Sequence, residues 1–100
     1  MLPLGRFRVE DDSMRPTLEP GDFVLVNRWA YRFRKPAEGD VVVLRSPEGP
    51  NFLIKRIANV VDATKVFVVG DNPQGSRDSR HFGPVDRRAL LGKVWLTARP

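Results

Sequence analysis

The 100-residue sequence is 41% hydrophobic and 29% charged and has a formal net charge of +5, a composition typical of one globular domain. It has no cysteine and one histidine, which excludes disulfides, thiol nucleophiles and metal sites built from several cysteine or histidine ligands. No apolar run exceeds about five residues, whereas a membrane-spanning helix needs roughly 20. We therefore expect a single domain over residues 1–100, without a transmembrane anchor, a bound metal or a cofactor.

Short apolar segments rich in β-branched residues recur along the chain, and turn-forming residues separate them. We predict strands over Phe23–Val26, Val41–Leu44, Phe52–Val61, Lys65–Val69 and Leu90–Thr97. Helix is predicted only around Asn27–Arg34 and Val85–Leu90. The pattern indicates an all-β protein, a single small folded sheet or barrel with at most one or two short helical turns.

The segment Asp12–Leu18 contains the first candidate for chemistry, Ser13, just ahead of a proline-containing turn that can hold it rigidly. The alternative is an ordinary serine in a turn. A serine nucleophile needs a base. The only histidine, His81, lies between Arg80 and Phe82, and these cationic surroundings do not favour an imidazole that accepts a proton.

Lys55 is a different candidate base, because it lies in the middle of a predicted apolar strand with Leu53 and Ile57 on the same face. Burial among aliphatic side chains disfavours the charged amine and lowers its pKa. Lowering a lysine pKa from about 10.4 to roughly 7–8 costs on the order of 4 kcal/mol, which a domain with a stability of about 5–15 kcal/mol tolerates. The alternative is a lysine whose amine reaches solvent from a barrel strand.

A polar segment over residues 70–80, which alone would be an ordinary surface loop, completes a three-part pattern. The parts are Ser-Met-x-Pro-Thr-Leu, then Lys-Arg in an apolar strand, then Gly-Asp-Asn-x-x-x-Ser-x-Asp-Ser-Arg. In this order they resemble the type I signal peptidases, serine proteases with a Ser/Lys dyad on an all-β fold. The match covers residues 9–94.

The resemblance implies that Ser13 is the nucleophile, that Lys55 is the general base and that Ser76 orients the lysine amine. The backbone N–H of Ser13 would supply one donor to the oxyanion. Further catalytic support is expected from Met14, Gly70, Asp71, Asn72, Asp78 and Arg80. Pairing of Asp71 with Arg56, and of Asp78 with Arg80, would make these charged residues part of the scaffold.

The sequence departs from the family pattern in several places. Family members are membrane-anchored and often carry an inserted β region where this chain has only residues 56–69. Some relatives have a hydroxyl two positions before the nucleophile, where this chain has Asp11. An ionised carboxylate cannot donate and repels developing negative charge, so either Asp11 points away or the second oxyanion donor comes from elsewhere. Glu10, Asp11 and Asp12 could also meet a cationic part of the substrate or Arg8, or form a solvated acidic turn.

The chain is short for this family. It has Phe-Arg-Val-Glu-x-Asp-Ser-Met near its N-terminus and, downstream, Gly-Asp-Asn-Pro followed by Ser-Arg-Asp-Ser-Arg-His-Phe-Gly-Pro-Val. With these motifs it resembles, within the family, the nickel-type superoxide dismutase maturation proteases. The resemblance implies a soluble, cytoplasmic serine endopeptidase that removes a short N-terminal leader from a precursor protein, here a nickel-type superoxide dismutase. In such a dismutase the free α-amine is a nickel ligand, and it does not exist while the leader is attached.

Two other functions stay open. Self-cleaving repressors of the DNA-damage response share the Ser/Lys domain, but they carry an upstream helix-turn-helix and cleavage site, which we do not expect here. We expect no nucleic-acid partner, but the alternative is a non-catalytic basic β-barrel that binds nucleic acid through Trp29, Tyr31, Phe33 and the basic residues of Arg28–Lys35. The same basic and aromatic patch could instead line the substrate cleft, contact an anionic membrane or be a half-buried helix.

Overall fold

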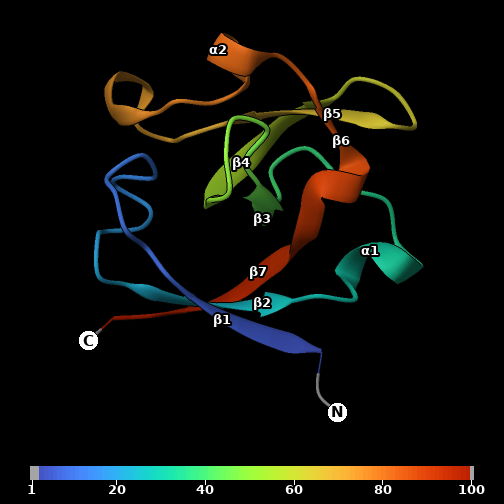
Figure 1. The fold of residues 1–100 in the computed structure, drawn as a ribbon. Helices are drawn as coiled ribbons and strands as arrows, with labels where there is room; N and C mark the ends of the chain where they lie inside the picture. Colours follow the sequence, from blue (N-terminus) through green and yellow to red (C-terminus); the bar gives the residue numbers. More distant parts are fainter. Residues whose placement is uncertain (1–2, 100) are drawn as a thin grey trace.

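The computed structural model describes residues 3–99, and its strands form one curled antiparallel sheet (Figure 1). The strand order is β1-β2-β7-β3-β4-β5-β6. The strands are β1 (Leu4–Arg8), β2 (Phe23–Asn27), β3 (Val41–Arg45), β4 (Phe52–Val60), β5 (Lys65–Val69), β6 (Val85–Asp86) and β7 (Leu90–Ala98). Helices α1 (Ala30–Phe33) and α2 (Ser79–Phe82) have four residues each, and 3₁₀ turns occur at Pro73–Gly75 and Arg87–Ala89. The prediction of an all-β fold is therefore confirmed.

All five predicted strands are present, and their ends lie within one residue of the predicted ends. Two strands, β1 and β6, were not predicted. The helix expected around Asn27–Arg34 is present as α1. Around Val85–Leu90 the expected helical turn is present only as the 3₁₀ turn Arg87–Ala89, because Val85 and Asp86 pair with β5. The unpredicted helix α2 starts at an Asp78 N-cap, whose carboxylate accepts a hydrogen bond from the Arg80 N–H.

Strand β3 lies between two apolar clusters, which explains why it is apolar at successive positions. Val43 belongs to one cluster, whereas Val42 and Leu44 belong to the other, since side chains alternate across a strand. Strand β4 pairs with β3 so that Lys55 lies opposite Val42. Directly opposed residues share a face of the sheet, so Lys55 lies on the face of the second cluster, as do its neighbours Leu53 and Ile57.

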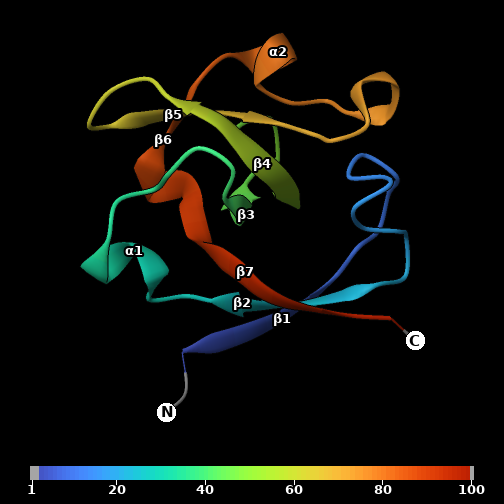
Figure 2. The same ribbon diagram turned by 180° about the vertical axis from the view of Figure 1, so that it is seen from behind.

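Two loops that are distant in sequence lie side by side at one end of the sheet, as both views show (Figures 1 and 2). One follows β1 and contains Ser13, and the other follows β5 and contains Ser76. The Asn72 N–H donates to the Ser13 carbonyl (2.9 Å), and the Asn72 side chain donates to the Asp12 carbonyl (3.1 Å). Helix α1 lies on the opposite side of the molecule from these loops. Within residues 3–99, neither helix has the length and apolarity needed to cross a lipid bilayer.

Candidate active site

The loop between β1 and β2 holds Ser13 in a defined position. Only 3% of the residue is exposed. Its carbonyl accepts the hydrogen bond from Asn72, and its own N–H donates to Oδ1 of Asp11 at 3.1 Å. The next residue, Met14, is buried in the first apolar cluster with Leu18 and Val24. Ser13 is thus anchored to the core through its neighbour and to the loop after β5 through its backbone.

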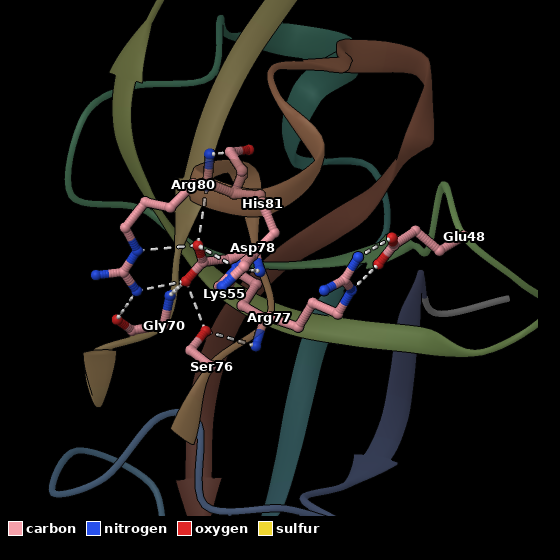
Figure 3. Close-up of polar contacts among 10 residues, drawn as sticks. Glu48, Lys55, Gly70, Ser76, Arg77, Asp78, Arg80 and His81 are labelled. Carbon is pink, nitrogen blue, oxygen red and sulfur yellow. Dashed lines mark hydrogen bonds and ion pairs between the residues drawn. The ribbon is translucent and has the colours of Figure 1, made fainter. Parts of the chain in front are cut away.

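Lys55 is buried, with 2% of the residue exposed, and its amine donates a hydrogen bond to the Ser76 hydroxyl at 3.2 Å (Figure 3). Burial lowers the pKa of the Lys55 amine below its ordinary value, and this effect outweighs the opposite influence of the negative charges on Asp11 and Asp78. The positive charge of Arg80 lowers the Lys55 pKa further. At a given pH, a larger fraction of Lys55 is therefore neutral than of an exposed lysine, and the neutral amine is the form that accepts a proton.

The Ser76 hydroxyl donates its own proton to Asp78 Oδ2 at 2.6 Å, which leaves an oxygen lone pair free to accept from Lys55. Asp78 is fully buried and also accepts hydrogen bonds from the Gly70 N–H (2.8 Å) and from the Arg80 guanidinium (Figure 3). Burial alone would raise the pKa of the Asp78 carboxyl, but the bonds from Arg80, Ser76 and Gly70 lower it well below its usual range. Asp78 is therefore an anion that fixes the orientation of Ser76.

Gly70 brings Ser13 and Ser76 together. A Cβ atom at this position would lie 2.2 Å from the Ser76 hydroxyl oxygen and 2.5 Å from the Ser13 carbonyl oxygen. Ser13 and Lys55 line the same small cavity of about 60 Å³. Within residues 3–99, the hydrogen bond of the lysine amine goes to Ser76, and none joins it to the Ser13 hydroxyl.

Asp71 and Asn72 connect the two loops, a role that was not predicted from the sequence. Asp71 pairs with the Arg56 guanidinium through bonds of 2.9 and 2.8 Å and accepts a third bond from the Thr17 hydroxyl at 2.5 Å. These bonds lower the pKa of the Asp71 carboxyl. No role was predicted for Thr17, although its place in the Ser-Met-x-Pro-Thr-Leu segment could have indicated that it contributes to the site. His81 lies on α2, half-exposed, and its Nδ1 accepts a bond from the Asp78 N–H at 3.4 Å.

Asp11 does not point away from the nucleophile, which leaves the other alternative, a second oxyanion donor from elsewhere. An aspartate can bond to the backbone N–H two residues later in a tight local turn, and Asp11 does so with Ser13. The N–H that was expected to bind an oxyanion is therefore occupied by a carboxylate.

The basic and aromatic patch divides into two parts. The Tyr31 hydroxyl donates to Asp40 at 2.8 Å, its ring packs against the second apolar cluster, and burial and Asp40 raise the Tyr31 pKa. Trp29 and Phe33 instead border a groove of about 510 Å³ between α1 and β7, with Asn27, Ala30, Arg34, Lys93, Val94 and Trp95. This α1–β7 groove shares no lining residue with the cavity at Ser13, so the patch does not line that cavity. Within residues 3–99, no group of three or more His, Cys, Asp or Glu residues is placed to hold a metal ion.

Comparison with known proteins identifies relatives for most of the chain. The family model described as "Signal peptidase, peptidase S26" matches residues 1–61 and 58–98. Mitochondrial ATP-independent inner membrane protease subunit 1b of Arabidopsis thaliana is 42% identical over 82% of this chain and 62% of the relative. Subunit 1a of the same protease is 37% identical over 92% of this chain and 68% of the relative. Signal peptidase I of Pseudomonas aeruginosa is 42% identical over 87% of this chain but only 33% of the relative. The chain thus spans between a third and about two thirds of the length of these relatives.

Proposed function

The chain belongs to the signal peptidase family, peptidase S26, and on that premise we propose that it is a serine endopeptidase with Ser13 as nucleophile and Lys55 as general base. The observation that carries the proposal is the buried amine of Lys55, which is hydrogen-bonded to Ser76 and lines the same cavity as Ser13. Catalytic hydrogen bonds are often long or incomplete before substrate binds. The proposal therefore requires the lysine amine to move within this cavity from Ser76 towards the Ser13 hydroxyl.

In the proposed reaction, neutral Lys55 accepts the proton of the Ser13 hydroxyl while Oγ forms a bond to the scissile carbonyl carbon. The carbonyl π electrons move to oxygen and give a tetrahedral oxyanion. As this intermediate collapses, the carbon–nitrogen bond breaks and protonated Lys55 gives its proton to the leaving amine. Water then attacks the acyl-enzyme, and Lys55 takes a proton from the water. Cleavage of the ester bond releases the carboxylic acid, and the proton returns to Ser13 Oγ.

Ser76 is proposed as a positioning residue for this proton transfer. Because its own proton is committed to Asp78, the Ser76 oxygen can only accept from the lysine amine. Asp78 is held as an anion by Arg80 and by the Gly70 N–H. The chain of contacts from Arg80 to Lys55 therefore sets where the amine rests between turnovers.

We propose a precursor protein with a short N-terminal leader as the substrate, and a nickel-type superoxide dismutase precursor in the cytoplasm as the specific candidate. Support for this finer assignment is the motif resemblance over residues 7–14 and 70–85. The relatives of this chain include mitochondrial inner membrane protease subunits and signal peptidase I. A signal-bearing precursor at a membrane is therefore the competing substrate.

The test uses purified protein and two precursors, one dismutase with its leader and one with a signal peptide, and measures the mass of each product. Ser13→Ala and Lys55→Ala should each abolish cleavage, and circular dichroism should show that both variants are folded. Lys65→Ala is the matched control, because this lysine lies half-exposed on β5 and should leave cleavage unchanged. Cleavage retained by either active-site variant contradicts the dyad. Cleavage of only the dismutase precursor supports the proposed substrate, and cleavage of only the signal-bearing precursor contradicts it.

The α1–β7 groove supports a second, independent candidate function, which is binding of single-stranded nucleic acid. Trp29 and Phe33 are 40% and 83% exposed beside Arg34, and aromatic platforms with nearby cations suit stacked bases and phosphates. Binding that weakens with salt, persists in Ser13→Ala and is lost in Trp29→Ala would support this function. The absence of binding to oligonucleotides at low salt would contradict this candidate function. Binding to anionic vesicles, measured in the same assay, would detect membrane contact instead.

A further inference from the structure

The backbone N–H of Ser13 is occupied by an acidic side chain. Asp11 Oδ1 accepts its hydrogen at 3.1 Å, and Asp11 is itself exposed while Ser13 is buried. The carboxylate therefore lies at the boundary between solvent and the candidate nucleophile.

This position matters because the backbone N–H of a nucleophilic serine can be one of the donors that bind the oxyanion. A donor already bonded to a carboxylate is not available to a second oxygen. A negative charge at this place also repels the charge that develops on the scissile carbonyl oxygen. The bond from Ser13 to Asp11 and a bond from Ser13 to an oxyanion thus exclude each other.

Asp11 also acts on Lys55 through its charge. The charged groups around the Lys55 amine are Asp11 and Asp78, which favour its protonated form, and Arg80, which disfavours it. Glu10 and Arg8 line the same cavity. In the free protein, the Asp11 carboxylate therefore works against the neutral lysine that the reaction requires.

We propose that Asp11 is a gate on the candidate active site. In the free protein its carboxylate accepts the hydrogen bond of the Ser13 N–H, and this bond must break before a scissile carbonyl can react. The proposal rests on the proposed function of Ser13 and Lys55 and adds a regulatory step to it. Arg8 lines the cavity as a cation and offers the released carboxylate a partner. Substrate binding that brings a carbonyl to Ser13 opens the gate by competing for the same N–H.

A purely structural role for Asp11 would be to shape the turn before Ser13. Asparagine separates the two roles, because its side-chain oxygen can accept the same hydrogen bond without carrying the charge. Glu10→Gln is the matched control, because Glu10 lines the same cavity and loses the same charge but does not bond to Ser13 in the structure.

The experiment measures the cleavage of a leader peptide from pH 5 to 10 with wild-type protein, Asp11→Asn, Asp11→Ala and Glu10→Gln. The gate predicts that Asp11→Asn raises kcat/KM at pH 7 by about tenfold, because hydrogen bonds to charged groups are worth more than neutral ones. It also predicts that the acidic limb of the pH profile shifts to lower pH. An unchanged or lower kcat/KM in folded Asp11→Asn, or an equal gain in Glu10→Gln, overturns the gate.

Two further readouts separate failure of the gate from failure of the proposed function. The rate at which a fluorophosphonate modifies Ser13, followed by intact mass, reports the nucleophile without any peptide substrate. No modification in any variant contradicts the proposed function, whereas modification at the same rate in wild type and Asp11→Asn contradicts the gate alone. NMR titration should show a lower Lys55 pKa in Asp11→Asn, and the Ser13 amide proton should move upfield in Asp11→Ala but not in Glu10→Gln.

Discussion

The Lys55 amine lies 3.2 Å from the Ser76 hydroxyl oxygen, and the proton of that hydroxyl points to Asp78. This relationship makes Ser76 an acceptor for the amine, since a hydroxyl with its proton committed elsewhere offers only lone pairs. The hydrogen bond to Ser76 thereby sets the resting position of the lysine amine, from which it must move to reach Ser13. The chemistry proposed for Ser13 depends on this restraint.

Replacement of Ser76 should slow catalysis without unfolding the protein. Ser76→Ala removes the acceptor that positions the lysine amine. We expect kcat to fall by about 10- to 100-fold, because the general base is then no longer held in position. Ser79→Ala is the matched control, because this buried serine, the first residue of α2, accepts from the Val68 N–H rather than from Lys55. Steady-state kinetics at several pH values measure the effect, and equal losses of kcat in both variants would contradict a positioning role.

The pH dependence of kcat/KM should report the ionisation of Lys55. Because burial lowers the pKa of this amine, the acidic limb should lie below the value of about 10.4 for an exposed lysine. The reaction needs the neutral amine, so activity should rise with pH through this ionisation and then stay constant. A profile whose only ascending limb lies at the value of an ordinary lysine would refute Lys55 as the base.

Asp78 should stabilise the fold in a pH-dependent way. Its pKa is lowered in the folded protein, so its contribution is present above the unfolded value of about 3.9 and is lost as the pH falls through the folded value. Asp78→Asn should lower the free energy of unfolding at pH 7 by about 2–4 kcal/mol, because the buried bonds to Arg80 and Gly70 weaken. Urea denaturation at pH 7 and pH 3 should show a smaller difference at pH 3. A constant difference at both pH values would refute this account.

A methyl group at Gly70 should disturb the site, because a Cβ there would overlap the Ser76 hydroxyl oxygen and the Ser13 carbonyl. Overpacking of this kind typically costs about 1–3 kcal/mol, and Gly70→Ala should also reduce cleavage. Gly49→Ala is the control, since a Cβ at Gly49 meets no atom within 4 Å. Thermal melts and cleavage rates of both variants provide the comparison, and wild-type behaviour of Gly70→Ala would contradict the close approach.

Replacement of the buried amine by an apolar side chain should stabilise the protein while abolishing cleavage. In the folded state the Lys55 pKa is lowered, so the unfolded chain binds the proton more tightly and the wild-type protein gains stability as the pH rises between the two pKa values. Lys55→Met should therefore raise the free energy of unfolding, by about 1–3 kcal/mol, most strongly below the folded pKa. Chemical denaturation at pH 6 and pH 10 tests this, and a destabilised Lys55→Met at pH 6 would be the contrary result.

The strands with continuous apolar residues were predictable, because every position of Val41–Leu44 faces one core cluster or the other. Strand β1 escaped prediction because it is half-exposed, contains Gly5 and alternates arginine with apolar residues, and only its pairing with β2 makes it a strand. Strand β6 has two residues, too few for a sequence pattern. Local propensity therefore indicated the buried strands but not the edges of the sheet.

The sequence by itself determined the residue types of the site: a serine before a rigid turn, a lysine between aliphatic neighbours and a polar loop rich in acidic residues and serine. Only the tertiary structure decided which atoms meet. It placed the lysine amine of β4 on Ser76, and it placed Asn72 of the loop after β5 on the Ser13 carbonyl. The physical reason is that these hydrogen bonds require elements distant in sequence to be positioned within tenths of an ångström of one another. That position follows from the pairing of β3 with β4 and from the contacts of Gly70 and Asn72, which no local pattern encodes.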